Sequence, residues 1–132
     1  MLIRTDGLPW PLALRLRHIL QSAISDIPAG SGVVVSFRDP DYSACTGGFH
    51  PVEFGIDRKG RLRYVSDLAF VGRPPDTELV KEVDFDFTAG VLRHFGVEHP
   101  IREGRALFAQ YQANFLAYHE LGAYVVTTEP MG

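Results

Sequence analysis

The fold is decided by residues 49–71, which read Phe49-His-Pro-Val-Glu-Phe-Gly-Ile-Asp-Arg-Lys-Gly-Arg-Leu-Arg-Tyr-Val-Ser-Asp-Leu-Ala-Phe-Val71. Apolar residues alternate with polar or small ones over 49–57 and again over 62–71, a pattern typical of β-strands with one buried face. The segment between them, Arg58-Lys59-Gly60, has the length and the closing glycine of a common hairpin loop. The stretch therefore predicts two antiparallel strands joined by a hairpin.

The length of this loop sets the expected register of the hairpin. A three-residue loop places Ile56 opposite Leu62, and two residues further along it places Phe54 opposite Tyr64. All of these apolar side chains then share one face, whereas a two-residue loop would set Ile56 against Arg61 and mix the faces. We therefore expect Phe54 and Tyr64 to lie together on the buried side of the sheet.

Residues 78–87 form a third alternating run that we expect to pair with the second strand. In the register that keeps the faces consistent, Tyr64 lies opposite Phe85 on the buried side. Arg63 then lies opposite Asp86 on the solvent side. The three strands together predict an antiparallel meander in which Phe54, Tyr64 and Phe85 point toward the helices.

The flanking sequence adds two helices and further strands. Apolar residues recur at helical spacing over 11–27 and 101–118, and short strand-like runs occupy 33–37 and 123–128. Residues 88–100 are ambiguous, although Val91, Leu92 and Phe95 fit a short helical turn. We predict a single α+β domain over residues 1–132, with an antiparallel meander sheet of about five strands and two main helices packed on one face.

Composition excludes several classes of function. The chain has 132 residues, a formal net charge of −3 and one cysteine. Nucleic-acid-binding proteins usually carry a basic patch, which this charge balance does not favour. One cysteine excludes an internal disulfide and fits a reducing compartment. No segment has the pattern of a signal peptide or the length of a membrane span. We predict a cytoplasmic protein with no nucleic-acid or membrane partner.

The loop that follows strand 33–37 is the place where we expect a binding site. It concentrates polar residues between two strands, and loops held by rigid strands often carry function. An Asp–His pair in this loop could act as a general base. An aspartate beside a proline, however, usually caps the backbone of its own turn. We assign no catalytic residue, and the candidate binding residues are Asp39, Asp41, Tyr42, His50 and Glu53.

The histidines do not have the spacing of a metal site. His50 and Glu53 are three residues apart on a predicted strand, so they point to opposite faces and cannot chelate one ion unless a bulge intervenes. Metal binding could otherwise draw on His50, His99 and His119 from distant segments. We predict no metal ion and no cofactor, and a structural role for His50.

An acidic row marks the third predicted strand. Glu82, Asp84 and Asp86 alternate along it, so their carboxylates should line one face about 6.8 Å apart. This row could receive a basic partner. Alternatively, Arg61 and Arg63 of the neighbouring strand could neutralise part of it, and we favour that interpretation.

Four motifs carry a resemblance to a known family. They are Phe37-Arg-Asp-Pro-Asp-Tyr-Ser43, Gly47-Gly-Phe-His-Pro-Val-Glu53, Asp84-Phe-Asp-Phe87 and Asn114-Phe-Leu-Ala-Tyr118. On these motifs the chain resembles, along its whole length, a small bacterial family known only as a domain of unknown function. Members look similar in fold to the mitochondrial matrix protein that binds the globular heads of a complement component. The resemblance implies a curved antiparallel sheet with helices and assembly into oligomers, and it implies no reaction.

The sequence thus favours a small soluble bacterial protein that acts as a non-enzymatic binding or assembly module. We expect a homo-oligomer, with a protein as a possible further partner. The alternative is a small enzyme or a ligand-binding domain with a polar site in the loop from Asp39 to Glu53. A weaker interpretation, suggested by the family likeness alone, is an accessory protein of a mobile genetic element.

Overall fold

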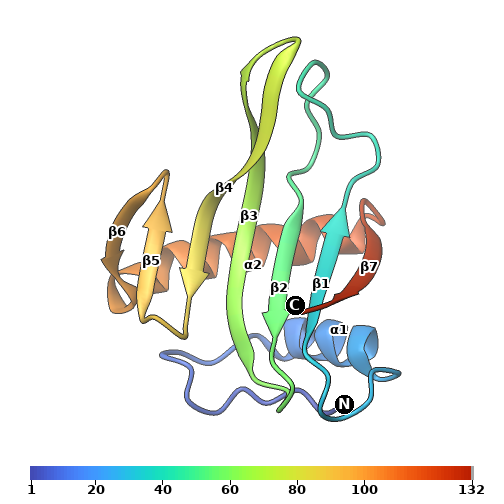
Figure 1. Ribbon diagram of the computed structural model, residues 1–132, viewed down its shortest axis with the longest axis vertical. Coiled ribbons are helices and arrows are strands. Elements are labelled where there is room, and N and C mark those ends of the chain that lie inside the picture. The colour runs from blue at the N-terminus through green and yellow to red at the C-terminus, as the bar shows by residue number, and fades with distance from the viewer. Residues whose placement is uncertain (132) are drawn as a thin grey trace.

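Seven strands form one antiparallel sheet in the computed structural model, which describes residues 1–131 (Figure 1). Their order across the sheet is β6-β5-β4-β3-β2-β1-β7. The sheet is therefore larger than the five strands that the sequence predicted, because two of its strands lie in the ambiguous segment 88–100. The strands are β1 (Val33–Arg38), β2 (Val52–Ile56), β3 (Leu62–Arg73), β4 (Asp76–Asp86), β5 (Val91–His94), β6 (Val97–Pro100) and β7 (Val125–Pro130).

The segment 88–100 forms a hairpin rather than a helical turn. Strands β5 and β6 pair with one another, and β5 also pairs with β4. The two turn residues, Phe95 and Gly96, have φ angles of 49° and 81°. Two-residue hairpin turns require positive φ, which glycine adopts easily and phenylalanine does not. The phenylalanine in a turn position explains why the sequence did not reveal this hairpin.

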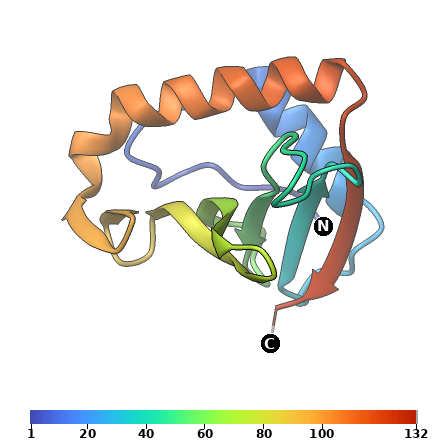
Figure 2. The same cartoon turned by 90° about the horizontal axis from the view of Figure 1, so that it is seen from above.

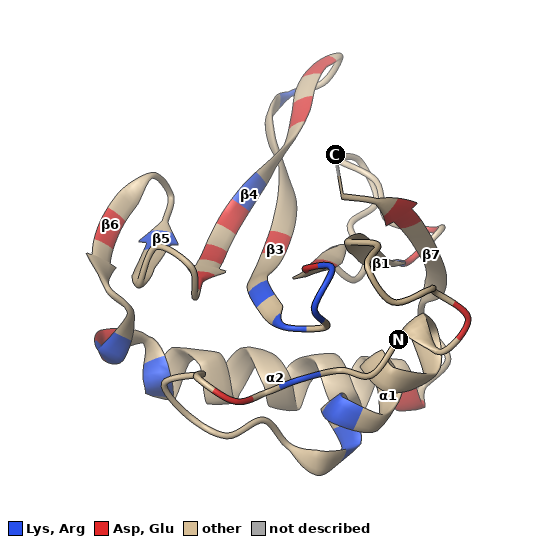
Figure 3. Ribbon diagram, turned by 60° about the horizontal axis from the view of Figure 1, so that its bottom comes forward, with Lys and Arg blue, Asp and Glu red and all other residues tan. Residues whose placement is uncertain are grey.

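Both helices cover the same face of the sheet (Figures 2 and 3). They are α1 (Leu14–Ile24) and α2 (Arg105–Glu120), and a short 3₁₀ helix, η1 (Ile101–Gly104), leads into α2. Helix α1 begins three residues later than the sequence predicted. At its start the Ala13 N–H donates a hydrogen bond to Gln112 Oε1 of α2 at 2.9 Å. Within residues 1–131 neither helix has the length and apolar character that a bilayer span requires.

The core lies between the helices and the sheet. Helix α1 contributes Leu16, Leu20 and Ile24, which are spaced four apart and therefore share one face. Helix α2 contributes Phe108 and Phe115. The sheet meets them with buried aromatic residues from three strands, namely Phe37, Phe54 and Phe85. Phe115 contacts two of these rings edge-on, with centroids 4.9 Å from Phe37 and 5.3 Å from Phe54.

A bulge between β2 and β3 changes the predicted register. Ile56 does pair with Leu62, as predicted, but Gly55 pairs with Tyr64 and Phe54 pairs with Val65. The pairing of Phe54 with Tyr64 is therefore wrong. A bulge of one residue moves every later side chain to the opposite face. Tyr64 accordingly lies on the outer face, where its ring covers Gly55.

A second bulge lies between β3 and β4. Val71 pairs with Glu78 as predicted, but beyond the bulge Asp67 pairs with Val83 and Tyr64 pairs with Asp86. The predicted pairing of Tyr64 with Phe85 is wrong for this reason. Glu82 is the residue left without a Cα partner in this ladder. The bulge lets its carboxylate reach the helix-covered face of the sheet instead of joining the acidic row.

Candidate binding cavity

A cavity of about 350 Å³ lies between α2 and the covered face of the sheet. Aromatic side chains from both layers form most of its wall, with polar side chains from α2 along its rim. The aromatic residues of the wall include Phe54, Phe85, Phe108, Tyr111, Phe115 and Tyr124. Small-molecule sites are commonly concave, mostly apolar and furnished with a few placed polar groups. The cavity has these properties.

A histidine and two carboxylates meet beside this cavity. His50 Nδ1 lies 3.1 Å from Asp67 Oδ1 and 3.1 Å from Glu82 Oε2. The Asp67 and Glu82 side chains are only 13% and 20% exposed, whereas His50 is 40% exposed. His50 and Asp67 also line the cavity wall. We call these three residues the histidine–carboxylate cluster.

The cluster exists because of the bulge in β4. Asp67 follows Val65 by two residues on β3, so both side chains point toward the helices. Regular alternation would have sent Glu82 to the other face together with Asp84 and Asp86. Placed by the bulge, it instead stands beside Asp67. Bulges frequently redirect a side chain next to a functional site.

The electrostatics of the cluster are dominated by burial. The pKa of the Asp67 carboxyl is raised to about 6, chiefly by burial; His50 acts to lower this pKa and the neighbouring Glu82 acts to raise it. Among residues 1–131, no lysine or arginine forms an ion pair with either carboxylate. Burial also raises the pKa of Tyr111 to about 12, so this cavity hydroxyl stays protonated at neutral pH. The cavity thus offers hydroxyl donors near a carboxylate-rich end.

The loop between β1 and β2 holds His50 in place. Asp39 accepts hydrogen bonds from the N–H groups of Asp41 at 2.9 Å and Phe49 at 3.1 Å, so it closes the loop on itself. The Tyr42 hydroxyl accepts a bond from the Phe70 N–H of β3 at 3.0 Å. On the helix side, the Phe49 ring lies 4.3 Å from that of Tyr118. The loop is therefore tied both to the sheet and to α2.

The five candidate residues do not converge on one site. The rings of Tyr42 and His50 are neighbours, with centroids 5.3 Å apart, and only His50 lines the cavity. The Asp39 carboxylate is used inside the loop, and Asp41 is exposed. Glu53 lies on the other face of the sheet, 3.9 Å from Arg38. His50 and Glu53 thus point apart, as their spacing predicts.

Sequence reasoning missed two residues of this region, Asp67 and Glu82. Asp67 is the one charged residue in the run from Val65 to Phe70, which could have drawn attention to it. Glu82 carried no comparable signal, because it fits the alternation of an acidic row. Within residues 1–131, His50, Asp67 and Glu82 form the only group of three or more His, Cys, Asp or Glu residues whose possible metal-ligand atoms all lie within 4.8 Å of one another. His99 and His119 do not join them.

Comparison with known proteins identifies a family. The family model described as "Protein of unknown function (DUF2787)" matches residues 11–129. The chain belongs to the DUF2787 family. No curated protein matches the chain.

Two solved structures resemble this DUF2787 protein over nearly its whole length. One is the hypothetical protein VC0508 from the VSP-II pathogenicity island of Vibrio cholerae, with 29% identity and a TM-score of 0.82 over 96% of this chain and 99% of the other. The second is the conserved hypothetical protein VC1805 from the Vibrio cholerae pathogenicity island VPI-2. It has 30% identity and a TM-score of 0.82 over 96% of this chain and 100% of the other. The second relative is described as sharing structural homology with the human P32 protein, which agrees with the resemblance noted from the sequence.

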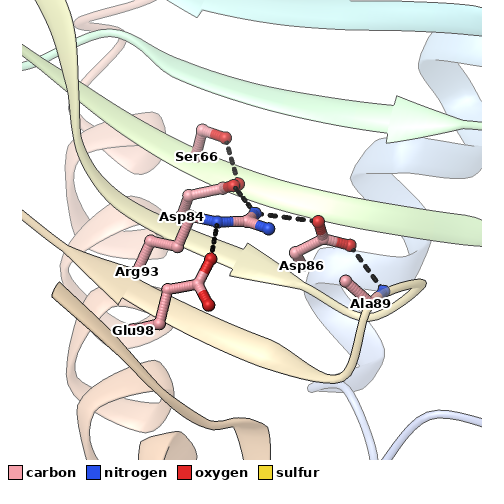
Figure 4. A network of polar contacts seen from close by, with 6 residues as sticks. All are labelled: Ser66, Asp84, Asp86, Ala89, Arg93 and Glu98. Atoms are coloured by element: carbon pink, nitrogen blue, oxygen red, sulfur yellow. Dashed lines mark hydrogen bonds and ion pairs between the residues drawn. The ribbon is translucent and has the colours of Figure 1, made fainter. Parts of the chain in front are cut away.

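The outer face of this DUF2787 protein carries a separate polar network (Figure 4). Arg93 Nη1 of β5 donates to Asp84 Oδ2 at 3.1 Å and to Asp86 Oδ2 at 2.9 Å, and its Nε donates to Glu98 Oε1 at 3.1 Å. Ser66 Oγ donates to the second oxygen of Asp84 at 2.8 Å. The acidic row is therefore neutralised from β5.

The expected neutralisation by Arg61 and Arg63 is wrong, because within residues 1–131 neither forms an ion pair with the acidic row. Arg63 Nη1 instead lies 3.4 Å from Asp57 Oδ2, at the start of the β2–β3 connection. The register shift at the second bulge removes Arg63 from its predicted place opposite Asp86, which pairs with Tyr64. The carboxylates of Asp84 and Asp86 already have hydrogen-bond and ion-pair partners within the chain, so they do not indicate a binding site for a basic partner.

Proposed function

We propose that this DUF2787 protein is a small-molecule-binding domain whose site is the cavity beneath α2. The single observation that carries the proposal is the cavity itself, because its aromatic walls end beside a half-exposed histidine and a carboxylate. Within a family of unknown function, fold alone assigns no ligand, whereas the residues that line the site restrict which ligands can bind. The proposal corresponds to the ligand-binding alternative drawn from the sequence, with the site in the cavity rather than in the loop from Asp39 to Glu53.

The lining supports one class of ligand. Flat apolar groups pack well against the aromatic rings of the wall, and edge-on contacts to such rings are favourable. Gln110 and Asn114 of α2 add amide groups at the rim, and His50 with Asp67 adds a polar end. The ligand is therefore an aromatic or polycyclic molecule that turns a polar substituent toward His50.

Fragment binding followed by protein NMR tests this proposal. A set of aromatic fragments is added to ¹⁵N-labelled protein, and amide shifts are mapped on the fold. We expect shifts to cluster on α2, on the segment 48–50 and on the middle of β3. Asn114→Trp should fill the rim and abolish them, whereas Ala117→Trp serves as the matched control, because it is an exposed α2 position that does not line the cavity.

Two results would count against a ligand-binding cavity. The first is an absence of fragment shifts at the cavity in wild-type protein. The second is equal binding by Asn114→Trp and Ala117→Trp, both checked for native structure by circular dichroism. Either result would place the function elsewhere on the surface.

A second candidate function is self-assembly through β7. This strand lies at the edge of the sheet, and all six of its residues are exposed. Val125 and Val126 are 54% and 44% exposed, and the nearby Leu121 is 74% exposed. An exposed apolar edge strand is a template for pairing with another strand. A second copy of the chain would pair along this edge.

Light scattering during size-exclusion chromatography tests the assembly proposal. We expect a species larger than a monomer for wild-type protein and a shift toward monomer for Val126→Lys, since a charge on an edge strand opposes pairing. Val97→Lys, on the opposite edge strand β6, is the matched control. A wild-type protein that stays monomeric at high concentration would remove this candidate.

A further inference from the structure

The histidine–carboxylate cluster brings three metal-ligating atoms to one point. His50 Nδ1, a carboxylate oxygen of Asp67 and one of Glu82 all lie within 4.8 Å of one another. They come from three different elements, the β1–β2 loop, β3 and β4, each fixed by its own contacts. His50 is tethered by the closed loop, and both carboxylates sit on paired strands.

The spacing of these atoms suits a bound ion. Zinc–nitrogen and zinc–oxygen bonds are about 2.0–2.2 Å long, so two ligands at a tetrahedral angle lie roughly 3.4 Å apart. The two distances from His50 Nδ1 are each 3.1 Å. Small side-chain adjustments would therefore bring all three atoms to bonding distance of one cation.

The charge of the cluster also favours a cation. Asp67 and Glu82 are largely buried, and within residues 1–131 neither has a lysine or arginine partner. Buried carboxylates are normally paired with a positive group or a metal ion. A protonated His50 would supply one positive charge for two carboxylates, whereas a divalent ion would balance both.

We propose that His50, Asp67 and Glu82 bind one divalent transition-metal ion, with zinc as the reference case. An imidazole nitrogen among the ligands favours zinc and its first-row neighbours over magnesium and calcium, which prefer oxygen ligands alone. Three protein ligands leave at least one coordination position open. Because the cluster adjoins the cavity, that position faces the same space as the proposed ligand. The ion itself needs no organic molecule to bind.

Calorimetric titration of zinc chloride into the metal-stripped full-length protein tests the site. All variants carry Cys45→Ser, because Cys45 is an exposed thiol that could bind zinc by itself. We expect saturable binding with one zinc ion per chain. Asp67→Asn and Glu82→Gln should each lower the zinc affinity by at least about tenfold, since even the loss of a residue that only hydrogen-bonds to a metal ligand has an effect of this size. Glu53→Gln is the matched control, because Glu53 and Glu82 are both 20% exposed carboxylates on strands.

A second measurement does not depend on how the variants fold. The ¹⁵N chemical shift of His50 Nδ1 should change on addition of one equivalent of zinc, while the shifts of His99 and His119 stay the same. An unchanged His50 shift overturns the proposal, and so does equal zinc affinity in the Glu82→Gln and Glu53→Gln proteins. Zinc alone is the probe, so these outcomes do not depend on whether the cavity binds fragments.

Discussion

Gly55 and Tyr64 face one another across β2 and β3, and the tyrosine ring fills the space that a Cβ at residue 55 would need. A side chain at this position would collide with the Cε1 and Cδ1 atoms of the ring. The contact fixes the outer-face position of Tyr64, above which the Lys81 ammonium lies 4.5 Å from the ring centre. Glycine at position 55 and the bulge that follows it belong to one arrangement.

The first prediction concerns this contact. Gly55→Ala should lower the free energy of unfolding by about 1–3 kcal/mol, because an added methyl group in a filled space forces its neighbours to move. Urea denaturation measures the change. In a Tyr64→Ala background the same substitution should cost close to nothing, since the ring is gone. Equal costs in both backgrounds would show that the ring does not restrict residue 55.

The second prediction concerns the tie between the loop and β3. Tyr42→Phe removes the hydroxyl that accepts the Phe70 N–H bond, so the unfolding free energy should fall by about 0.5–1.5 kcal/mol. Amide hydrogen exchange should accelerate at Phe70 and in the loop 39–50. Tyr118→Phe is the control, because that ring packs on Phe49 while no protein hydrogen bond of its hydroxyl is found within residues 1–131. Unchanged exchange at Phe70 would contradict the tie.

The third prediction concerns pH and the outer-face network. Burial alone would raise the pKa of Asp86, but the Ala89 N–H and Arg93 donate to its carboxylate and hold the pKa below the ordinary value of 3.8. A carboxyl whose pKa is lowered on folding stabilises the protein above the unfolded pKa and loses that contribution as pH falls through the folded value. Thermal stability should therefore decline as pH falls below about 4.

Asp86→Asn is the variant that isolates this contribution. It should be less stable than wild type at pH 7 and should lose less stability on acidification, because the titrating group is gone. Asp41→Asn, an exposed aspartate of the loop, should keep the wild-type pH profile. Parallel acid profiles for wild type and Asp86→Asn would contradict the assignment to Asp86.

The fourth prediction concerns the β5–β6 turn. Phe95 has a φ of 49° and is 62% exposed, so its side chain gains little from packing while its backbone adopts a conformation that costs roughly 1–2 kcal/mol for most residues. Phe95→Asn creates the Asn-Gly sequence that such turns prefer, and it should raise the melting temperature. Phe95→Val, a β-branched residue disfavoured at positive φ, should lower it. The opposite order would show that the Phe95 side chain stabilises the turn.

The limits of prediction from sequence follow from the two bulges. Alternation correctly located β2, β3 and β4, and it gave the pairs Ile56–Leu62 and Val71–Glu78. An extra residue in one strand cannot be recognised from an alternating sequence. The pairs beyond each bulge are therefore shifted by one residue from the predicted register. This shift places Tyr64 on the outer face of the sheet. It is also the reason why the sequence did not predict that His50, Asp67 and Glu82 lie together.

Local preferences account for the other differences. The loop residues could be named from their turn chemistry, and Asp39 does cap its own turn. Which side of the sheet each loop residue reaches depends on contacts with β3 and α2, which are distant in sequence. The β5–β6 hairpin was missed because its turn uses phenylalanine where glycine or asparagine is usual.

The position of β7 has a consequence for how the chain acquires this structure. Val33, in the first strand, pairs with Pro130 of β7, which is far away in the sequence. During synthesis the side of β1 that pairs with β7 therefore stays unpaired until residues 125–130 have left the ribosome. Pairing of segments so far apart in the sequence slows folding, because closing the long loop between them costs conformational entropy before the contacts that compensate for it have formed.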